Sequence, residues 1–202
     1  MKLNMPGTIG SAKIVFSEGL LMKAKIGIVG LGFVGSAIRA SVDDPEFSLV
    51  LVDKDPTRGT HTFKDLFDCE GVFVCVPSPQ GDDGSCDTSI LEDVLLQLKD
   101  YNGVIISKCT APPDVYERLN EQYPNLVHAP EFLTAANAVR DYINGKFAII
   151  GGKVGAYRRE AERIIRLTQT GLGDNVRHCG IGEASLAKYT INSFLATKVA
   201  FM

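Results

Sequence analysis

Three glycines with the spacing of a phosphate-binding turn follow the first strongly apolar run of the chain. In KIGIVGLGFVG, Gly30, Gly32 and Gly35 form the pattern G-x-G-x-x-G. In such a turn the first glycine permits the tight bend, the second lets a pyrophosphate approach the backbone, and the third allows a helix to pack closely on a strand. A helix that begins here would also direct its free N–H groups and positive dipole end at the phosphates. We therefore predict that this turn, together with Phe33 and Val34, binds a dinucleotide.

An acidic residue at the end of the next apolar run supports this prediction. Asp53 closes the run SLVLVD and lies 23 positions after Gly30. A ribose-binding carboxylate is expected at a spacing of about 20. It would accept hydrogen bonds from the ribose hydroxyls and repel a 2′-phosphate, so NAD is favoured as the cofactor. Lys54 also belongs to the cofactor-binding candidates, and with Arg58 it leaves NADP open, because a cation beside the ribose would offset a phosphate charge. The plain alternative is a glycine-rich turn with an incidental aspartate at a strand end.

Short runs rich in valine and isoleucine alternate with segments of helical spacing over most of the chain. The strand candidates are 25–29, 48–52, 71–76, 104–107, 126–129 and 147–151, and the helix candidates are 35–42, 88–98, 114–122 and 156–168. Continuous apolar strands separated by helices indicate a parallel sheet that is covered on both faces. We expect an α/β fold in three parts: an N-terminal extension over 1–21, a Rossmann-like doubly wound parallel sheet over 22–180, and the start of a long interdomain helix over 181–202.

Composition and charge narrow the classes of partner. The 202 residues include 21 basic and 24 acidic side chains, for a net charge of −3 at pH 7. A slightly acidic chain without a run of basic residues disfavours nucleic acid and anionic membranes as partners. No stretch approaches about 18 uninterrupted apolar residues, so we expect no membrane-spanning segment. The five cysteines lack a C-x-x-C pair, which argues against a disulfide framework or a zinc site. We expect a cytoplasmic protein without a bound metal.

A succession of shorter motifs continues after the glycine turn. They are Val74-Cys-Val-Pro77, the loop from Asp83 to Asp87, Ser107-Lys-Cys-Thr-Ala-Pro112, Pro130-Glu-Phe-Leu133, Gly151-Gly152, and a final segment from Glu183 to Lys198. In this order they resemble the UDP-glucose/GDP-mannose dehydrogenase family from about residue 22 to the end of the chain. The resemblance implies that a nucleotide sugar, UDP-glucose or a similar one, is oxidised twice at its primary alcohol to the uronic acid. Two NAD would be reduced, and a cysteine would hold the intermediate as a thioester.

The same resemblance implies roles for individual residues. Thr110 resembles the threonine that helps to place water and substrate, and it also belongs to the cofactor-binding candidates. Glu131 matches the carboxylate of the Pro-Glu-Phe-Leu motif, a candidate acid or base. Lys188 and Asn192 resemble the pair that stabilises the developing alkoxide or oxyanion. The residues that would border the adenosine and nicotinamide ribose region are Val76 and Pro77.

The positions of these residues agree in part with those roles. Thr110 and Glu131 come just after predicted strands, where open α/β sheets place their ligand crevice. Lys188 and Asn192 are four apart and therefore share one helical face. A lysine on an otherwise apolar helix needs a partner or a function, because desolvating its ammonium group is costly. By spacing alone, a strand-end cap at Thr110, a helix-start carboxylate at Glu131 and a solvated Asn192 are favoured, and the family resemblance reverses this preference.

The sequence departs from the family pattern at several positions. Ala135 stands where the family commonly has a second carboxylate. Cys109 occupies a position that is usually serine, and we interpret it as a small buried filler rather than a nucleophile. The family's nucleophilic cysteine and its sugar-nucleotide domain lie downstream of the matched motifs, so we expect a truncated copy that holds the cofactor-binding portion. Two alternatives stay open: a non-catalytic NAD-binding module, and a dehydrogenase of the β-hydroxyacid or 6-phosphogluconate type.

The last helix candidate is apolar on nearly every side. Phe194, Leu195 and Phe201 gather on one side of it, while Leu186 and Tyr189 cover much of the other. A helix with this pattern is typical of a buried environment. By the family resemblance, the segment would be an interdomain helix that packs in a dimer. We expect a homodimer through this helix, and self-association or fraying there in the isolated chain.

Overall fold

The structure, a computed structural model, describes residues 24–42 and 47–202, and its centre is a seven-stranded sheet. The strands are β1 Ala24–Val29, β2 Phe47–Val52, β3 Gly71–Val74, β4 Val104–Ser107, β5 Leu126–His128, β6 Ala148–Gly151 and β7 Val176–Cys179. They lie in the order β2-β1-β3-β4-β5-β6-β7. Strands β1 to β5 pair in parallel, and β3 and β4 are buried along their whole length. Such strands need cover on both faces.

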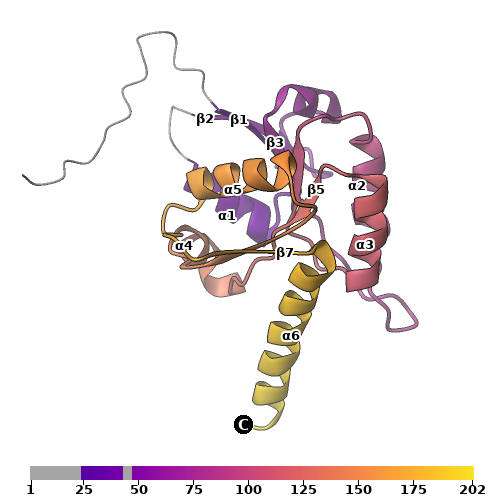
Figure 1. The fold of residues 1–202 in the computed structure, drawn as a ribbon, viewed down its shortest axis with the longest axis vertical. Helices are drawn as coiled ribbons and strands as arrows, with labels where there is room; N and C mark the ends of the chain where they lie inside the picture. The colour runs from indigo at the N-terminus through magenta and orange to yellow at the C-terminus, as the bar shows by residue number, and fades with distance from the viewer. Residues whose placement is uncertain (1–23, 43–46) are drawn as a thin grey trace, which may run out of the picture.

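Helices supply this cover from both sides. They are α1 Phe33–Ser41, α2 Ser89–Gln97, α3 Pro113–Gln122, α4 Ala138–Ile143, α5 Ala156–Thr168 and α6 Ile181–Ala200, with short 3-10 turns η1 Phe63–Asp68 and η2 Ala135–Asn137. On one face, α1, α4 and α5 bury Ile38, Tyr142 and Ile164 in a common core. On the other face, α2 and α3 bury Leu95 and Tyr116 in a second core (Figure 1). The expected Rossmann-like, doubly wound α/β architecture is confirmed.

The far edge of the sheet differs from the prediction of a wholly parallel sheet. Strand β6 pairs with β5 in the antiparallel direction, through His128 and Gly151, and then pairs in parallel with β7. A parallel crossover usually needs a helix long enough to return the chain along the sheet. The six residues of α4 span only about 9 Å, and this helix packs against α1 instead. The chain therefore enters β6 without having returned along the sheet, and β6 runs antiparallel to β5. The extension expected over 1–21 lies outside the described residues.

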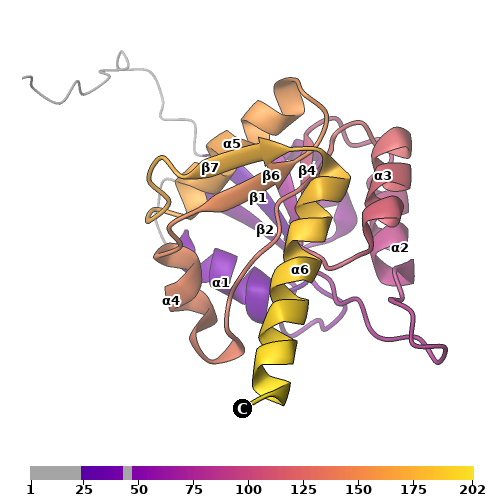
Figure 2. The same cartoon turned by 60° about the horizontal axis from the view of Figure 1, so that its bottom comes forward.

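Helix α6 leaves the sheet edge and projects away from the domain (Figure 2). Its N-terminal half packs closely: a Cβ at Gly151 of β6 would lie 2.5 Å from the Cβ of Ala184. Its C-terminal half carries exposed apolar side chains, with Phe194 67% and Val199 77% exposed. The sequence pattern predicted an apolar surface on all sides, and the described chain covers only its first turns. No helix of the described residues is both long and apolar enough to cross a membrane.

Candidate functional site

A cavity of about 850 Å³ opens at the carboxyl ends of the central strands. From β1 the chain continues to β2 on one side, and it returns to β3 on the other. In open α/β sheets a ligand crevice forms outside the carboxyl ends of the strands at such a reversal of strand order. One end of the cavity is lined by Asp53, Lys54 and Arg58, and the other by Thr110 and Glu131.

The glycine turn forms the wall between these two ends. Gly30 has a φ of +87°, and a Cβ there would lie 2.8 Å from the carbonyl oxygen of Cys75. A Cβ at Gly35 would lie 1.9 Å from the carbonyl oxygen of Gly30, so only glycine lets α1 pack this closely. At Gly32, by contrast, a Cβ would meet nothing within 4 Å. The space beside Gly32 faces the cavity, where the spacing predicted that a pyrophosphate approaches the backbone.

Asp53 lies at the end of β2 and is fixed to the glycine turn. Its Oδ2 accepts a hydrogen bond from the backbone N–H of Leu31 at 2.6 Å, and its Oδ1 accepts one from the N–H of Asp55 at 2.9 Å. Lys54 and Arg58 also line the cavity, and the guanidinium of Arg58 lies 3.4 Å from Asp55. Asp53 is therefore held at the mouth of the cavity, beside the glycine turn that its spacing in the sequence indicated.

The segment after β3 lines the cavity with Val76, Pro77 and a residue that sequence reasoning missed, Ser78. The Oγ atom of Ser78 is buried and has no hydrogen-bond partner among the described residues. A buried hydroxyl without a partner is costly, and a water molecule or a ligand in the cavity would supply the partner. The signal in the sequence was a hydroxyl between Pro77 and Pro79, two residues without an N–H group, directly after a strand.

Glu131 lines the opposite end of the cavity, and Lys188 of α6 contacts it there. The Nζ of Lys188 lies 2.8 Å from the Oε1 of Glu131 and also donates a hydrogen bond to its carbonyl oxygen. The other oxygen, Oε2, accepts the N–H of Leu133 at 2.6 Å. The two side chains are only 7% and 16% exposed, for lysine and glutamate respectively. The lysine that needed a partner on an apolar helix therefore has one, from the Pro-Glu-Phe-Leu motif.

Thr110 and Asn192 have different positions relative to this pair. Thr110 is half-buried and lines the cavity. Helix α6 is fixed to the same loop, because the hydroxyl of Ser185 donates a hydrogen bond to the carbonyl oxygen of Ala111 at 2.5 Å. Asn192 lies one turn beyond Lys188, is exposed, and is not among the residues that line the cavity. Two of the four predicted catalytic residues, Thr110 and Glu131, thus line one cavity end, and Lys188 joins them through its contact with Glu131.

Lys108 is a second residue of this end that received no role from the sequence. It follows β4 directly, is 6% exposed and lines the cavity. Burial lowers the pKa of its ammonium group to about 8, while the charge of Glu131 opposes this shift and that of Lys188 adds to it. The signal was a lysine immediately after a continuous apolar strand, two residues before Thr110.

The two cysteines at the cavity are protonated thiols. Burial raises the pKa of Cys109 to about 11, and burial also raises the pKa of Cys75 far above its usual range. The Sγ of Cys109 donates to the carbonyl oxygen of Val74 at 3.4 Å. A thiol with a raised pKa is a poor nucleophile. The structure also contains no cluster of three metal-ligating side chains within the residues it describes.

Comparisons with known proteins identify the family. The model of the UDP-glucose/GDP-mannose dehydrogenase family, NAD binding domain, matches residues 58–168. The chain is 32% identical over 181 residues to a UDP-glucose 6-dehydrogenase of Pseudomonas aeruginosa, covering 79% of this chain and 39% of the relative. It is 25% identical over 224 residues to the UDP-glucose 6-dehydrogenase AglM of Haloferax volcanii, covering 87% of this chain and 52% of the relative.

A solved structure shows the same fold. It is a UDP-glucose dehydrogenase from Pyrobaculum islandicum, with a TM-score of 0.72 at 20% identity, covering 93% of this chain and 53% of that one. The chain thus spans about half the length of the relatives that it matches, or less. The family match includes the strand ends that carry Thr110 and Glu131 and extends over more than half of the sequence. The chain therefore belongs to the UDP-glucose/GDP-mannose dehydrogenase family and contains the family's NAD-binding domain.

Proposed function

We propose that this chain is the cofactor-binding portion of an NAD-dependent dehydrogenase that oxidises the primary alcohol of a nucleotide sugar, UDP-glucose or a similar one, to the uronic acid. The observation that carries the proposal is the Glu131–Lys188 pair, whose glutamate lines the same cavity as the glycine turn. A pair of oppositely charged groups next to a dinucleotide-binding turn is suited to proton and charge transfer beside a bound cofactor.

The cavity suggests how NAD would be held. Asp53 would bind the hydroxyls of the adenosine ribose, and the turn at Gly32 would approach the pyrophosphate. The nicotinamide half would then extend toward Val76, Pro77 and the unpartnered hydroxyl of Ser78. Bound NAD supplies the acceptor for a hydride. The chain itself supplies orientation and binding on both sides of the turn.

The residues at the opposite end would handle charge on the substrate. The Lys188 ammonium group would stabilise an alkoxide that develops on the sugar, and Glu131 would take up or return a proton. The Thr110 hydroxyl would help to place the substrate or water. Asn192 remains a predicted partner of Lys188, one turn away on the exposed part of α6.

Oxidation of an aldehyde to an acid by the thioester route requires a positioned thiolate. None of the five cysteines matches the family position, and the thiols of Cys75 and Cys109 are held protonated by burial. We therefore propose that this chain by itself does not complete the second oxidation. Formation of uronic acid at more than a trace rate would contradict this.

Oligomeric state and compartment follow from two other features. The exposed apolar half of α6 favours a homodimer, with a second copy covering Phe194 and Val199. All five cysteines are free thiols, which favours the reducing cytoplasm. Light scattering over a concentration series tests the dimer, and a Phe194→Ser variant would shift it to monomer. A wild-type chain that stays monomeric at every concentration would contradict it.

A non-catalytic NAD-binding module is the second candidate, and Ala135 in place of a second carboxylate favours it. Calorimetry with NAD and NADP, followed by incubation with NAD and UDP-glucose or GDP-mannose, separates the candidates. We expect NAD to bind in preference to NADP, more weakly in Asp53→Ala, and NADH to appear in the wild type but not in Lys188→Met. Binding without NADH formation would favour the module, and absence of NAD binding would refute both.

A further inference from the structure

A buried cation lies at the end of the cavity opposite Asp53. The ammonium group of Lys108 lies 5.9 Å from the centre of the Phe73 ring and 5.8 Å from that of the Tyr142 ring. In the part of the chain that the structure describes, no carboxylate lies within ion-pair distance of it. A lysine in this setting has lost most of its hydration without gaining a direct counter-ion.

The groups around Lys108 leave a surplus positive charge at this end of the cavity. Glu131, after β5, is already neutralised by Lys188 of α6 at 2.8 Å. The thiol of Cys75, after β3, and the phenol of Tyr142, on α4, are uncharged, because burial raises both pKa values well above the physiological range. The two ammonium groups and the single carboxylate therefore sum to a net charge of +1 at neutral pH.

This surplus lies where the nicotinamide half of the cofactor would end. With the adenosine ribose at Asp53 and the pyrophosphate at Gly32, the second nucleotide would extend past the ends of β3 and β4 toward Lys108 and Thr110. This step rests on the proposed function, since it takes the direction of the bound dinucleotide from Asp53.

We infer that Lys108 determines the preference of this site between the two redox forms of the cofactor, and that it favours NADH over NAD+. The oxidised nicotinamide ring carries a positive charge and the reduced ring does not, whereas the rest of the molecule is the same. A nearby ammonium group therefore repels only the oxidised form, and its repulsion is strong in a cavity with little water. Lys108 is on this view a residue that selects between redox states, without taking part in proton transfer.

The test compares the dissociation constants of NAD+ and NADH for the whole chain at pH 6.5, by calorimetry and by NADH fluorescence. Lys108→Met removes the charge and keeps the length of the side chain. We expect the ratio of the NAD+ constant to the NADH constant to fall roughly tenfold, the effect of a unit charge about 10 Å away at an effective dielectric constant of about 20. An unchanged ratio would overturn the inference.

Lys54→Met is the matched control, because it removes one positive charge from the other end of the same cavity. Both forms of the cofactor carry the same adenosine half, so this variant should change the two constants by the same factor and leave their ratio unaltered. An equal fall of the ratio in both lysine variants would show a general charge effect and would overturn the assignment to Lys108.

A second measurement needs no variant. Burial places the pKa of Lys108 at about 8, so its charge is present at pH 6.5 and lost by pH 9.5. The ratio in the wild type should fall over this range and stay level in Lys108→Met. If both cofactor forms bind but the ratio of their dissociation constants changes neither with pH nor in Lys108→Met, this inference alone is refuted. If neither form binds, the proposed function is refuted together with it.

Discussion

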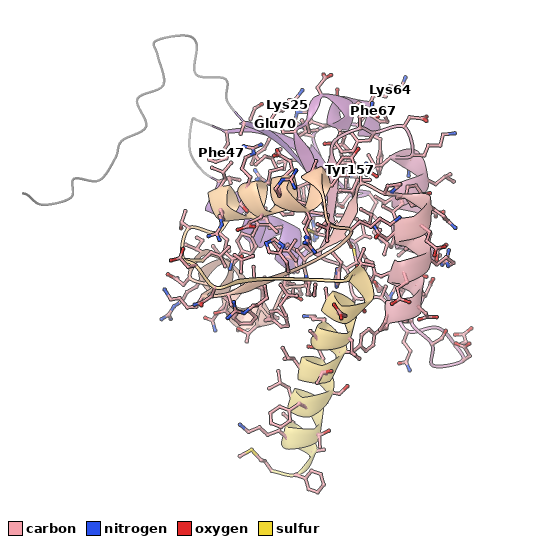
Figure 3. The ribbon with its side chains drawn as sticks, in the orientation of Figure 1. Lys25, Phe47, Lys64, Phe67, Glu70 and Tyr157 are labelled. Atoms are coloured by element: carbon pink, nitrogen blue, oxygen red, sulfur yellow. The ribbon has the colours of Figure 1, made fainter. Side chains whose placement is uncertain are left out.

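Charged side chains lie in opposite settings at the two ends of the strands. The amino ends are called here the amino edge of the sheet, and the carboxyl ends are called the carboxyl edge. At the amino edge, Lys25 lies 3.5 Å from Asp68, and Arg163 of α5 pairs with Glu70 while both remain more than 40% exposed. Lys25 and Glu70 lie at the end of the domain away from α6 (Figure 3). At the carboxyl edge the charges are buried, as in the pair formed by Glu131 and Lys188 or in Lys108, which has no ion-pair partner among the described residues.

The difference indicates which set of charges serves chemistry rather than stability. Exposed ion pairs contribute about 0–1 kcal/mol, and water screens them. Buried charges lose hydration that their partners seldom replace in full, so they are weak stabilisers and are expensive to leave unpaired. Charges kept in such positions at the mouth of a ligand cavity are typical of a functional site.

The largest effect is expected from breaking the buried pair. Glu131→Gln leaves the Lys188 ammonium group buried without its carboxylate, and we expect the free energy of unfolding to fall by about 3 kcal/mol. Urea denaturation measures this loss. Addition of Lys188→Met to Glu131→Gln should restore much of the stability, because no unpaired charge then remains. A loss below about 1 kcal/mol would place this pair with the exposed pairs of the amino edge.

Replacement of Lys108 should raise the free energy of unfolding instead of lowering it. Its pKa of about 8 in the folded chain lies below the usual 10.5, so the unfolded chain binds the proton more tightly and the charged form destabilises the fold at pH 7. This cost disappears as the pH rises from 8 to 10.5. Lys108→Met should therefore raise the free energy of unfolding by about 2–3 kcal/mol at pH 7, and by little near pH 10.5. Equal stability of the two proteins at pH 7 would show that the charge is better solvated than its burial indicates.

Gly32→Ala separates cofactor binding from stability at the carboxyl edge. The added methyl group would meet nothing within 4 Å in the chain, so the free energy of unfolding should change by less than about 1 kcal/mol. The same methyl group would occupy the space for the pyrophosphate, and we expect NAD binding to weaken by about tenfold, or about 1.4 kcal/mol. Calorimetry and thermal unfolding on one sample give both numbers. Normal NAD binding by this variant would place the phosphates elsewhere.

The smallest effect is expected at the amino edge. Arg163→Met removes the exposed partner of both Glu70 and Glu160 and should cost less than about 1 kcal/mol of unfolding free energy. The cost should shrink further in 1 M salt, where charges are screened over about 3 Å. NAD binding should be unchanged in calorimetry. A larger loss, or weaker binding, would mean that the two edges are coupled.

The sequence predicted the parts of the fold that depend on local pattern. The first five strands, the glycine turn and the position of Asp53 all follow from continuous apolar runs and their ends, and these agree with the structure. Strand β7 was not predicted, because Arg177 and His178 in it are exposed and the strand carries no apolar run. The direction of β6 depends on how a short helix packs on α1, which spacing does not reveal.

Prediction of the site reached a similar limit. Glu131 and Lys188 were each identified, but their contact joins residues 57 positions apart and depends on where α6 crosses the sheet edge. Lys108 and Ser78 become candidates only through burial and missing partners, which are properties of the folded chain. Asn192 was assigned by the family resemblance and shares a helical face with Lys188, and the exposure of α6 beyond Lys188 leaves its role a prediction.

Helix α6 connects the cavity mechanically with the outside of the domain. Lys188 lies in its buried part, and the helix continues to Ala200 over about 18 Å. No glycine or proline interrupts it after Glu183, and kinks arise mainly at such residues. The helix therefore has no hinge between the ammonium group at the cavity and the bare apolar end. A partner that bound the outer end would therefore also restrict the position of Lys188 against Glu131.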